Sequence, residues 1–107
     1  MQIDEIFEAD KRLNRKKRTT PLLNSPFLDE IANRQIFIKA ECLQHTGSFK
    51  FRGAYSAISS IPIEKRKKGV IAYSSGNHAQ GVAFAAKIHK IPATIIMPED
   101  APEIKIN

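Results

Sequence analysis

The residue with the clearest chemical potential in this sequence is Lys50, within the segment TGSFKFRGA at residues 46–54. Apolar residues recur after it at helical spacing, so we expect a helix capped near Ser48 with Lys50 in its first turn. A cation at that position opposes the helix dipole, and the two flanking phenylalanines remove water from it, so the neutral amine is favoured. A neutral lysine amine attacks carbonyl groups and forms Schiff bases. The simpler alternative is an exposed lysine at a helix start.

A second polar segment, SSGNH at residues 74–78, directly follows a short apolar run. Backbone N–H groups that enter a helix N-terminus bind anions, and hydroxyl and amide side chains add further donors. The segment therefore predicts an anion site. The simpler alternative is a helix cap, in which Ser75 or Asn77 holds the first turn and Gly76 permits the bend.

Both segments need elements that bring them together. The hydrophobic pattern predicts a helix over 3–13, an extended segment at 19–23, a helix from Ser25 to Asn33, a strand at 36–41, the helix after Ser48, a strand at 69–73, a helix to about Lys90 and a strand at 92–97. The alternation from residue 36 onward predicts an α/β fold, a parallel sheet with flanking helices. Ligands of such sheets bind beyond the carboxyl ends of the strands, where both polar segments are expected.

Composition and charge distribution indicate which classes of binding partner to expect. The chain has 107 residues, 42% of them hydrophobic and 26% charged, which is typical of one globular domain. The net charge of +6 is carried by two basic runs, residues 11–18 and 65–68. Neither run contains an aromatic residue, so we interpret them as solvated surface and expect no nucleic-acid partner.

Other features predict a cytoplasmic protein without membrane or metal. No apolar run reaches the roughly 18–20 residues that span a bilayer, and the first residues do not resemble a signal peptide. The three histidines show no metal-ligand spacing with the single cysteine, Cys42. We expect His89, near a helix C-terminus, to interact favourably with the helix dipole.

With both motifs identified, residues 19–107 resemble the threonine and serine dehydratases and the related serine racemases. These are pyridoxal-phosphate enzymes with the tryptophan-synthase-β type of fold. The resemblance rests on the segments 46–54 and 74–78 at matching spacing. It implies that residues 1–107 are a single partial domain, the N-terminal part of such an enzyme. A helix and basic segment occupy 1–18, and the order strand, helix, strand, helix, strand occupies 19–107.

The resemblance also implies residue roles. Lys50 matches the lysine that carries pyridoxal 5'-phosphate as a Schiff base and then removes the substrate's α-proton. Phe49 matches an aromatic residue that packs beside the cofactor ring, and Asn77 matches the amide that contacts the cofactor's phenolic oxygen. The matching loop holds the carboxylate of a small amino-acid substrate, here with Ser74, Ser75, Gly76, Asn77 and His78. In the racemases, the serine that matches Ser75 also acts as acid and base on the opposite face.

The implied activity is deamination of threonine or serine to a 2-oxo acid and ammonia. A racemase-like activity, and a catalytically silent fragment that only folds or associates, stay open as alternatives. The longer relatives carry a glycine-rich loop for the cofactor phosphate and a polar partner for the pyridine nitrogen, and the five glycines here form no such run. A homo-oligomer is compatible with the full-length form.

Overall fold

The structure is a computed structural model that describes residues 2–101. Its helices and strands, in chain order, are α1 (Ile3–Leu13), β1 (Leu22–Asn24), α2 (Pro26–Ala32), β2 (Phe37–Lys39), α3 (Lys50–Ser60), α4 (Ile63–Arg66), β3 (Val70–Tyr73), α5 (Asn77–His89) and β4 (Ala93–Ile96). Short 3₁₀ turns occupy Asn14–Lys16, Glu41–Leu43 and His45–Gly47. Among the described residues, no helix has both the length and the apolar character that crossing a membrane requires.

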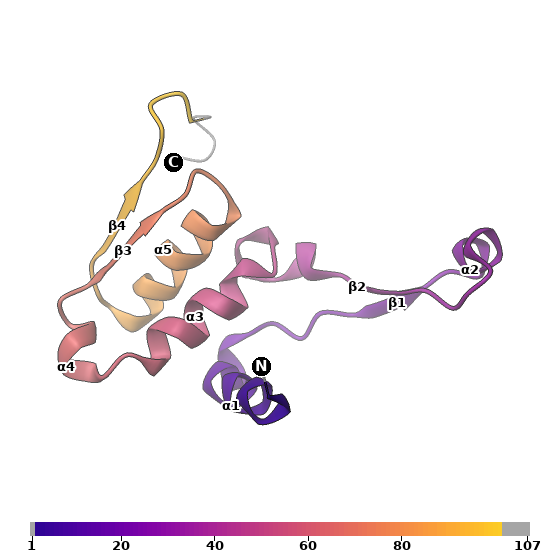
Figure 1. Ribbon diagram of the computed structural model, residues 1–107, viewed down its shortest axis with the longest axis horizontal. Coiled ribbons are helices and arrows are strands. Elements are labelled where there is room, and N and C mark those ends of the chain that lie inside the picture. Colours follow the sequence, from indigo (N-terminus) through magenta and orange to yellow (C-terminus); the bar gives the residue numbers. More distant parts are fainter. Residues whose placement is uncertain (1, 102–107) are drawn as a thin grey trace.

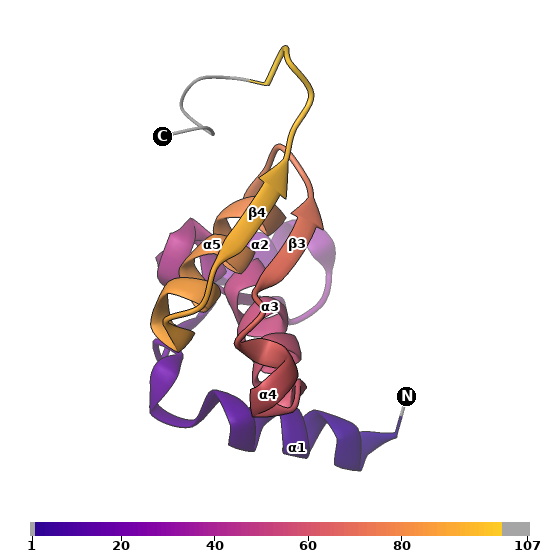
Figure 2. The same cartoon turned by 90° about the vertical axis from the view of Figure 1, so that its left-hand side faces the viewer.

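One of the two sheets in the described part of the chain is a parallel pair of strands. β3 and β4 pair in register from Val70 opposite Ala93 to Tyr73 opposite Ile96, and Figure 2 shows both arrows pointing the same way. Parallel neighbours need a crossover connection, which α5 supplies. The predicted α/β class and the predicted order of strand, helix and strand over 69–97 are therefore confirmed.

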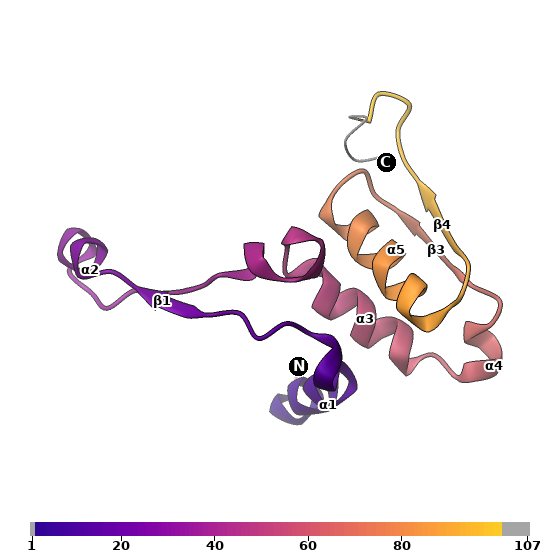
Figure 3. The ribbon, with the colours of Figure 1, turned by 180° about the vertical axis from the view of Figure 1, so that it is seen from behind.

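The core lies between α3 and α5, which run side by side with their N-termini at the same end (Figures 1 and 3). The large buried side chains come from α3, where Phe51, Tyr55 and Ile58 are almost fully covered. The facing surface of α5 is made of small residues, among them Gly81 and Ala85, so the two helices approach closely. This close approach fixes the start of α3 against the first turns of α5.

The strand predicted at 36–41 does not join the parallel sheet, so that part of the prediction is wrong. β2 pairs antiparallel with β1 instead, and the pair carries α2 at its tip as an arm that projects from the α3–α5 core (Figure 1). The reason is local: α2 ends on Asn33 in the left-handed conformation, which reverses the chain and brings 37–39 back beside 22–24. Two further left-handed residues, Thr46 and Gly47, then turn the chain into α3.

The N-terminal helix packs against the outer side of α3. Leu13 joins the core, and the Arg12 Nε donates a hydrogen bond of 3.1 Å to the Ser56 hydroxyl. The apolar residues that predicted this helix, Ile3, Ile6 and Phe7, are nevertheless exposed. Their amphipathic pattern therefore predicted the helix correctly, although most of its apolar face lies open.

Candidate active site

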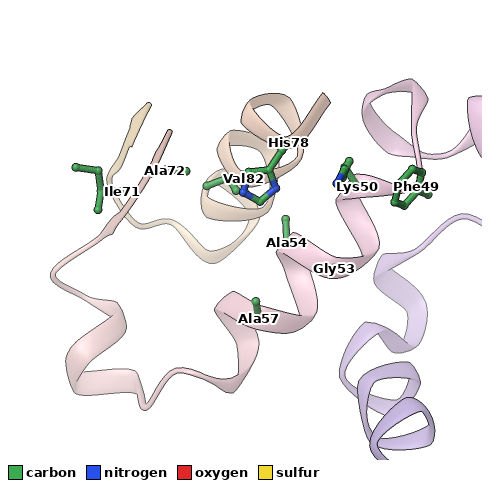
Figure 4. A pocket seen from close by; sticks show the side chains of 9 residues that line it. All are labelled: Phe49, Lys50, Gly53, Ala54, Ala57, Ile71, Ala72, His78 and Val82. Atoms are coloured by element: carbon green, nitrogen blue, oxygen red, sulfur yellow. The ribbon is translucent and has the colours of Figure 1, made fainter. Parts of the chain in front are cut away.

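A pocket opens where the first turn of α5, the face of α3 and β3 meet. Its volume is about 440 Å³, within the range of small-molecule sites. Figure 4 shows Lys50 and His78 projecting toward this region from the first turns of α3 and α5. The remaining wall is apolar and consists of Phe49, Gly53, Ala54, Ala57, Ile71, Ala72 and Val82.

Lys50 is the first residue of α3, so its predicted place in the first turn is confirmed. Its side chain is half-buried, and its Nζ lies 5.1 Å from the centroid of the Phe49 ring. Within residues 2–101, the amine takes part in no hydrogen bond or ion pair. The amine is therefore free to react with a ligand.

The predicted cap of this helix is wrong. Phe49, not Ser48, is the N-cap residue, and no side chain caps the helix. The Ser48 hydroxyl is instead buried without a hydrogen-bond partner, as is the Thr46 hydroxyl. Both belong to the turn that leads into Lys50, where Thr46 has a φ of 61°. Because buried hydroxyls normally find partners, this turn has polar capacity that the described residues leave unused.

The turn from Ser74 to His78 also differs from a side-chain cap. Gly76 is the N-cap of α5, and neither Ser75 nor Asn77 hydrogen-bonds into the first turn. The only side-chain hydrogen bond that the structure gives this turn runs from the Gly76 N–H to the Ser74 hydroxyl oxygen, at 3.2 Å among the described residues. The first-turn N–H groups of α5 are thus free of side-chain acceptors and can serve an anion.

The structure brings the two predicted segments to one end of the helix pair. Lys50 and His78 line the same pocket, and a Cβ on Gly81 would lie 3.1 Å from the Lys50 carbonyl carbon. Ser74, Ser75, Gly76 and Asn77 do not line this pocket, but they lead directly into His78 on the same side. Within residues 2–101, no three His, Cys, Asp or Glu side chains gather as metal ligands would.

Sequence reasoning did not identify the small residues of the pocket wall. Gly53, Ala54 and Ala57 follow Lys50 at positions i+3, i+4 and i+7, so they lie along the same face of α3. Their small size leaves the space beside Lys50 open. The signal was present in the sequence as a run of small residues at helical spacing.

An ion pair holds the start of α3 in place. The Arg52 guanidinium donates two hydrogen bonds of 2.7 Å to the Glu41 carboxylate, which also accepts one of 2.5 Å from the Thr20 hydroxyl. The hydrogen bonds from Arg52 lower the pKa of Glu41 from its ordinary 4.5 to about 2, against the opposing effect of burial. Glu41 is therefore ionised at neutral pH and ties the arm to the helix that carries Lys50.

Comparison with known proteins identifies a family and several similar proteins. Residues 13–107 match the family described as pyridoxal-phosphate dependent enzyme. The L-threo-3-hydroxyaspartate ammonia-lyase of Saccharomyces cerevisiae is 49% identical over 95% of this chain and 31% of its own length. The L-threonine ammonia-lyase of Thermotoga maritima is 51% identical over 97% of this chain and 26% of its own length.

A solved structure agrees with these sequence relatives. The serine racemase of Dictyostelium discoideum superposes with a TM-score of 0.95 and 41% identity, over 100% of this chain and 35% of its own. The chain thus spans between about a quarter and a third of the length of these relatives. Both ammonia-lyase and racemase names occur among them, so the named reactions of these relatives differ.

Proposed function

The chain belongs to the family of pyridoxal-phosphate-dependent enzymes, and from this premise we propose that it is part of an enzyme that deaminates threonine or serine. The products are a 2-oxo acid and ammonia. Residues 1–107 are, on this proposal, one partial domain of that enzyme. The observation that carries the proposal is the Lys50 amine, unpaired among residues 2–101, in a pocket shared with His78 at the end of the helix pair where the 74–78 turn lies.

The residues present fit the cofactor near Lys50. The pocket is lined mainly by apolar atoms, as a flat heteroaromatic ring requires, and its one amine has no competing partner among the described residues. The unpartnered hydroxyls of Thr46 and Ser48 add polar capacity in the preceding turn. On this proposal Lys50 holds the cofactor covalently, Phe49 packs beside its ring and Asn77 donates to its phenolic oxygen.

When bound, pyridoxal phosphate supplies the sink for the electron pair left at the substrate's α-carbon. The chain's own residues supply orientation and proton transfer. The free first-turn N–H groups of α5, together with Ser74, Ser75, Gly76, Asn77 and His78, hold the substrate carboxylate. Once the substrate's amino group has taken the place of Lys50 on the cofactor, the freed Lys50 Nζ would accept the α-proton, because it lies at the rim that holds the carboxylate. The α-proton and the β-hydroxyl leave the substrate as one molecule of water. A second water then cleaves the bond between the α-carbon and the amino nitrogen, which gives the 2-oxo acid and ammonia.

A racemase-like activity is the second candidate, and the similarity to serine racemase favours it. Racemisation needs a proton donor on the face of the α-carbon opposite Lys50. Ser75 is the residue we assign to that role, because its half-buried hydroxyl makes no cap hydrogen bond and is free to move a proton. The two activities share Lys50 and differ in whether Ser75 is required.

Cofactor attachment to Lys50 is the first prediction to test. Pyridoxal phosphate is mixed with the purified chain, the covalent bond is reduced with borohydride, and the modified lysine is located by peptide mass spectrometry. We expect visible absorbance and modification at Lys50, both lost in Lys50→Ala. Lys65→Ala is the matched control, because Lys65 is exposed and does not line the pocket, and it should leave both signals unchanged.

Substrate turnover is then followed with threonine and with serine. Formation of 2-oxobutyrate or pyruvate that depends on Lys50 supports deamination, and interconversion of serine enantiomers that is lost in Ser75→Ala supports racemisation. Labelling spread equally over the exposed lysines would contradict the proposed role of Lys50. Labelling at Lys50 without turnover would favour a chain that binds cofactor but is catalytically silent by itself.

A further inference from the structure

A second pocket lies at the opposite end of the α3–α5 pair from Lys50. Its volume is about 250 Å³, and it is lined by Ile63, Arg66, Lys67, His89, Lys90 and Ile91. These residues come from α4, from the end of α5 and from the segment that follows α5. Lys50 begins α3, and the eleven residues of that helix put roughly 15 Å between Lys50 and the C-terminal end of α3. Within the part of the chain that the structure describes, no acidic residue lines this pocket.

Arg66 is held rigidly in the pocket wall. Its NH2 group donates hydrogen bonds of 2.7 and 2.8 Å to the carbonyl oxygens of Ser59 and Ile61, and its Nε donates one of 3.2 Å to Ile61. Its NH1 group lies 3.3 Å from the His89 Nδ1. A guanidinium has five N–H donors, so one NH1 hydrogen is left for a ligand. The side chain is thus preorganised, which lowers the entropy lost on binding.

The contact with Arg66 also fixes the state of His89. Because an arginine only donates, His89 Nδ1 must accept, and the ring is neutral with its proton on Nε2. That Nε2–H donates a hydrogen bond of 3.1 Å to the Ser59 hydroxyl oxygen, and the ring stacks on Tyr55 with a centroid distance of 4.7 Å. Burial, Arg66 and Lys16 lower the pKa of His89. The pKa of His89 therefore moves away from the charged form that would interact most strongly with the dipole of α5, and that interaction stays a prediction.

The rim of the pocket adds two exposed cations. Lys67 and Lys90 are exposed, and Lys90 is the left-handed residue that ends α5. Lys67 lies 3.4 Å from Glu64, but both side chains are largely exposed, and such pairs contribute little. An anion in the pocket can therefore compete with Glu64 for Lys67. The pocket combines one fixed guanidinium, two adaptable ammonium groups and two apolar side chains.

We propose that this pocket binds a phosphate group, as inorganic phosphate or as a small phosphate ester, at a site separate from Lys50. The free NH1 hydrogen of Arg66 and the ammonium groups of Lys67 and Lys90 donate to the phosphate oxygens. Ile63 and Ile91 provide contacts for the apolar body of an ester. The negative charge of the ligand offsets the field of Arg66 and Lys16 that opposes protonation of His89, so binding makes that ring easier to protonate.

The test uses inorganic phosphate as the probe and the ring protons of the three histidines as reporters, in a zwitterionic buffer at low salt. We expect the His89 signals to shift saturably, with a dissociation constant on the order of 1 mM, and its pKa to rise when phosphate is bound. His45, whose ring packs between Phe51 and Phe84 away from this pocket, serves as the internal reference. Phenyl phosphate should bind more tightly than inorganic phosphate, because it also contacts the two isoleucines.

Matched charge-removing variants separate the pocket from general charge attraction. Lys67→Gln and Lys90→Gln should each weaken phosphate binding several-fold. Lys87→Gln removes the same charge from the last turn of α5 outside the pocket lining, and it should change binding by less than about twofold. The proposal is overturned if His89 does not respond to phosphate, or if Lys87→Gln weakens binding as much as the two pocket variants do.

Discussion

Among single residues, Glu41 and Arg52 have the clearest energetic role outside the two pockets. Their side chains are only 16% and 26% exposed, and the pairing is bidentate, which distinguishes it from the exposed pair of Lys11 and Glu8. A carboxylate held by charged donors and by the Thr20 hydroxyl is stabilised in its ionised form. Its contribution to folding therefore depends on pH.

The sign of that dependence follows from the lowered pKa of Glu41. In the unfolded chain the carboxyl titrates near 4.5, and in the folded chain near 2, so the stabilisation is complete above pH 4.5 and is lost as pH falls toward 2. We expect Glu41→Gln to lower the free energy of unfolding by about 1–3 kcal/mol at pH 7. Urea unfolding at pH 7 and at pH 3 should show a clearly smaller difference between variant and parent at pH 3.

Glu8→Gln is the matched control, because Glu8 makes an exposed ion pair on α1. It should leave the free energy of unfolding nearly unchanged at both pH values. An equal effect of Glu41→Gln at pH 7 and pH 3 would contradict the proposed ionic contribution.

Among the elements, those set by local pattern could be predicted, and those set by long-range pairing could not. The small-residue helix 77–89 and its flanking strands follow directly from periodicity and from Gly and Pro positions. Periodicity could not predict which strand pairs with residues 37–39. Their alternation fits either sheet, and the choice of the 22–24 segment depends on the reversal at Asn33.

The key residues of the Lys50 pocket could be predicted from the sequence, whereas those of the Arg66–His89 pocket could not. The 74–78 turn follows β3 of the parallel pair, as predicted, but the segment before Lys50 follows the antiparallel strand β2. The two segments therefore meet through the packing of α3 against α5 and not through a shared sheet edge. The Arg66–His89 contact joins residues 23 positions apart, and Arg66 belongs to a basic run that alone indicates only solvated surface. Only the packing of α4 against the end of α5 converts that run into a pocket wall.

The close approach of α3 and α5 gives a prediction at the element scale. A Cβ at position 81 would lie 3.1 and 3.2 Å from the Lys50 carbonyl carbon and oxygen, and 3.2 Å from the Phe51 nitrogen. Backbone atoms cannot rotate away, so Gly81→Ala must separate the helices and should cost about 1–3 kcal/mol of unfolding free energy. Thermal and urea unfolding measure this change.

Gly53 offers a control on the facing helix. A Cβ there meets nothing within 4 Å, and the residue is exposed within α3. Gly53→Ala should stabilise the chain by about 0.5–1 kcal/mol, because alanine is the better helix former. Effects of the same sign for the two substitutions would contradict the proposed contact at Gly81.

The whole molecule is more extended than a typical domain of its size. Its radius of gyration is 16.6 Å, whereas compact domains of this length have about 13 Å. Its accessible surface is 8071 Å², compared with roughly 6,000 Å² for a folded monomer of this mass. The arm formed by β1, α2 and β2 accounts for much of the difference, and it carries exposed Leu, Ile and Phe side chains.

These exposed apolar side chains lead to a prediction about association. Phe27 and Ile31 on α2 are 70% and 68% exposed, so replacing both with Gln should change the free energy of unfolding by less than about 0.5 kcal/mol. Phe51 is 0% exposed, and Phe51→Ala should lower the free energy of unfolding by about 3–5 kcal/mol.

Exposed apolar patches favour association, so we expect small-angle scattering of the parent to show a particle size that grows with concentration, and the double variant to show no such growth. In dilute solution both should keep a radius of gyration well above 13 Å, because the arm gains nothing by folding back onto a core whose residues are already covered. A compact radius in the parent, or a large loss of stability in the double variant, would mean that α2 packs against the rest of the chain.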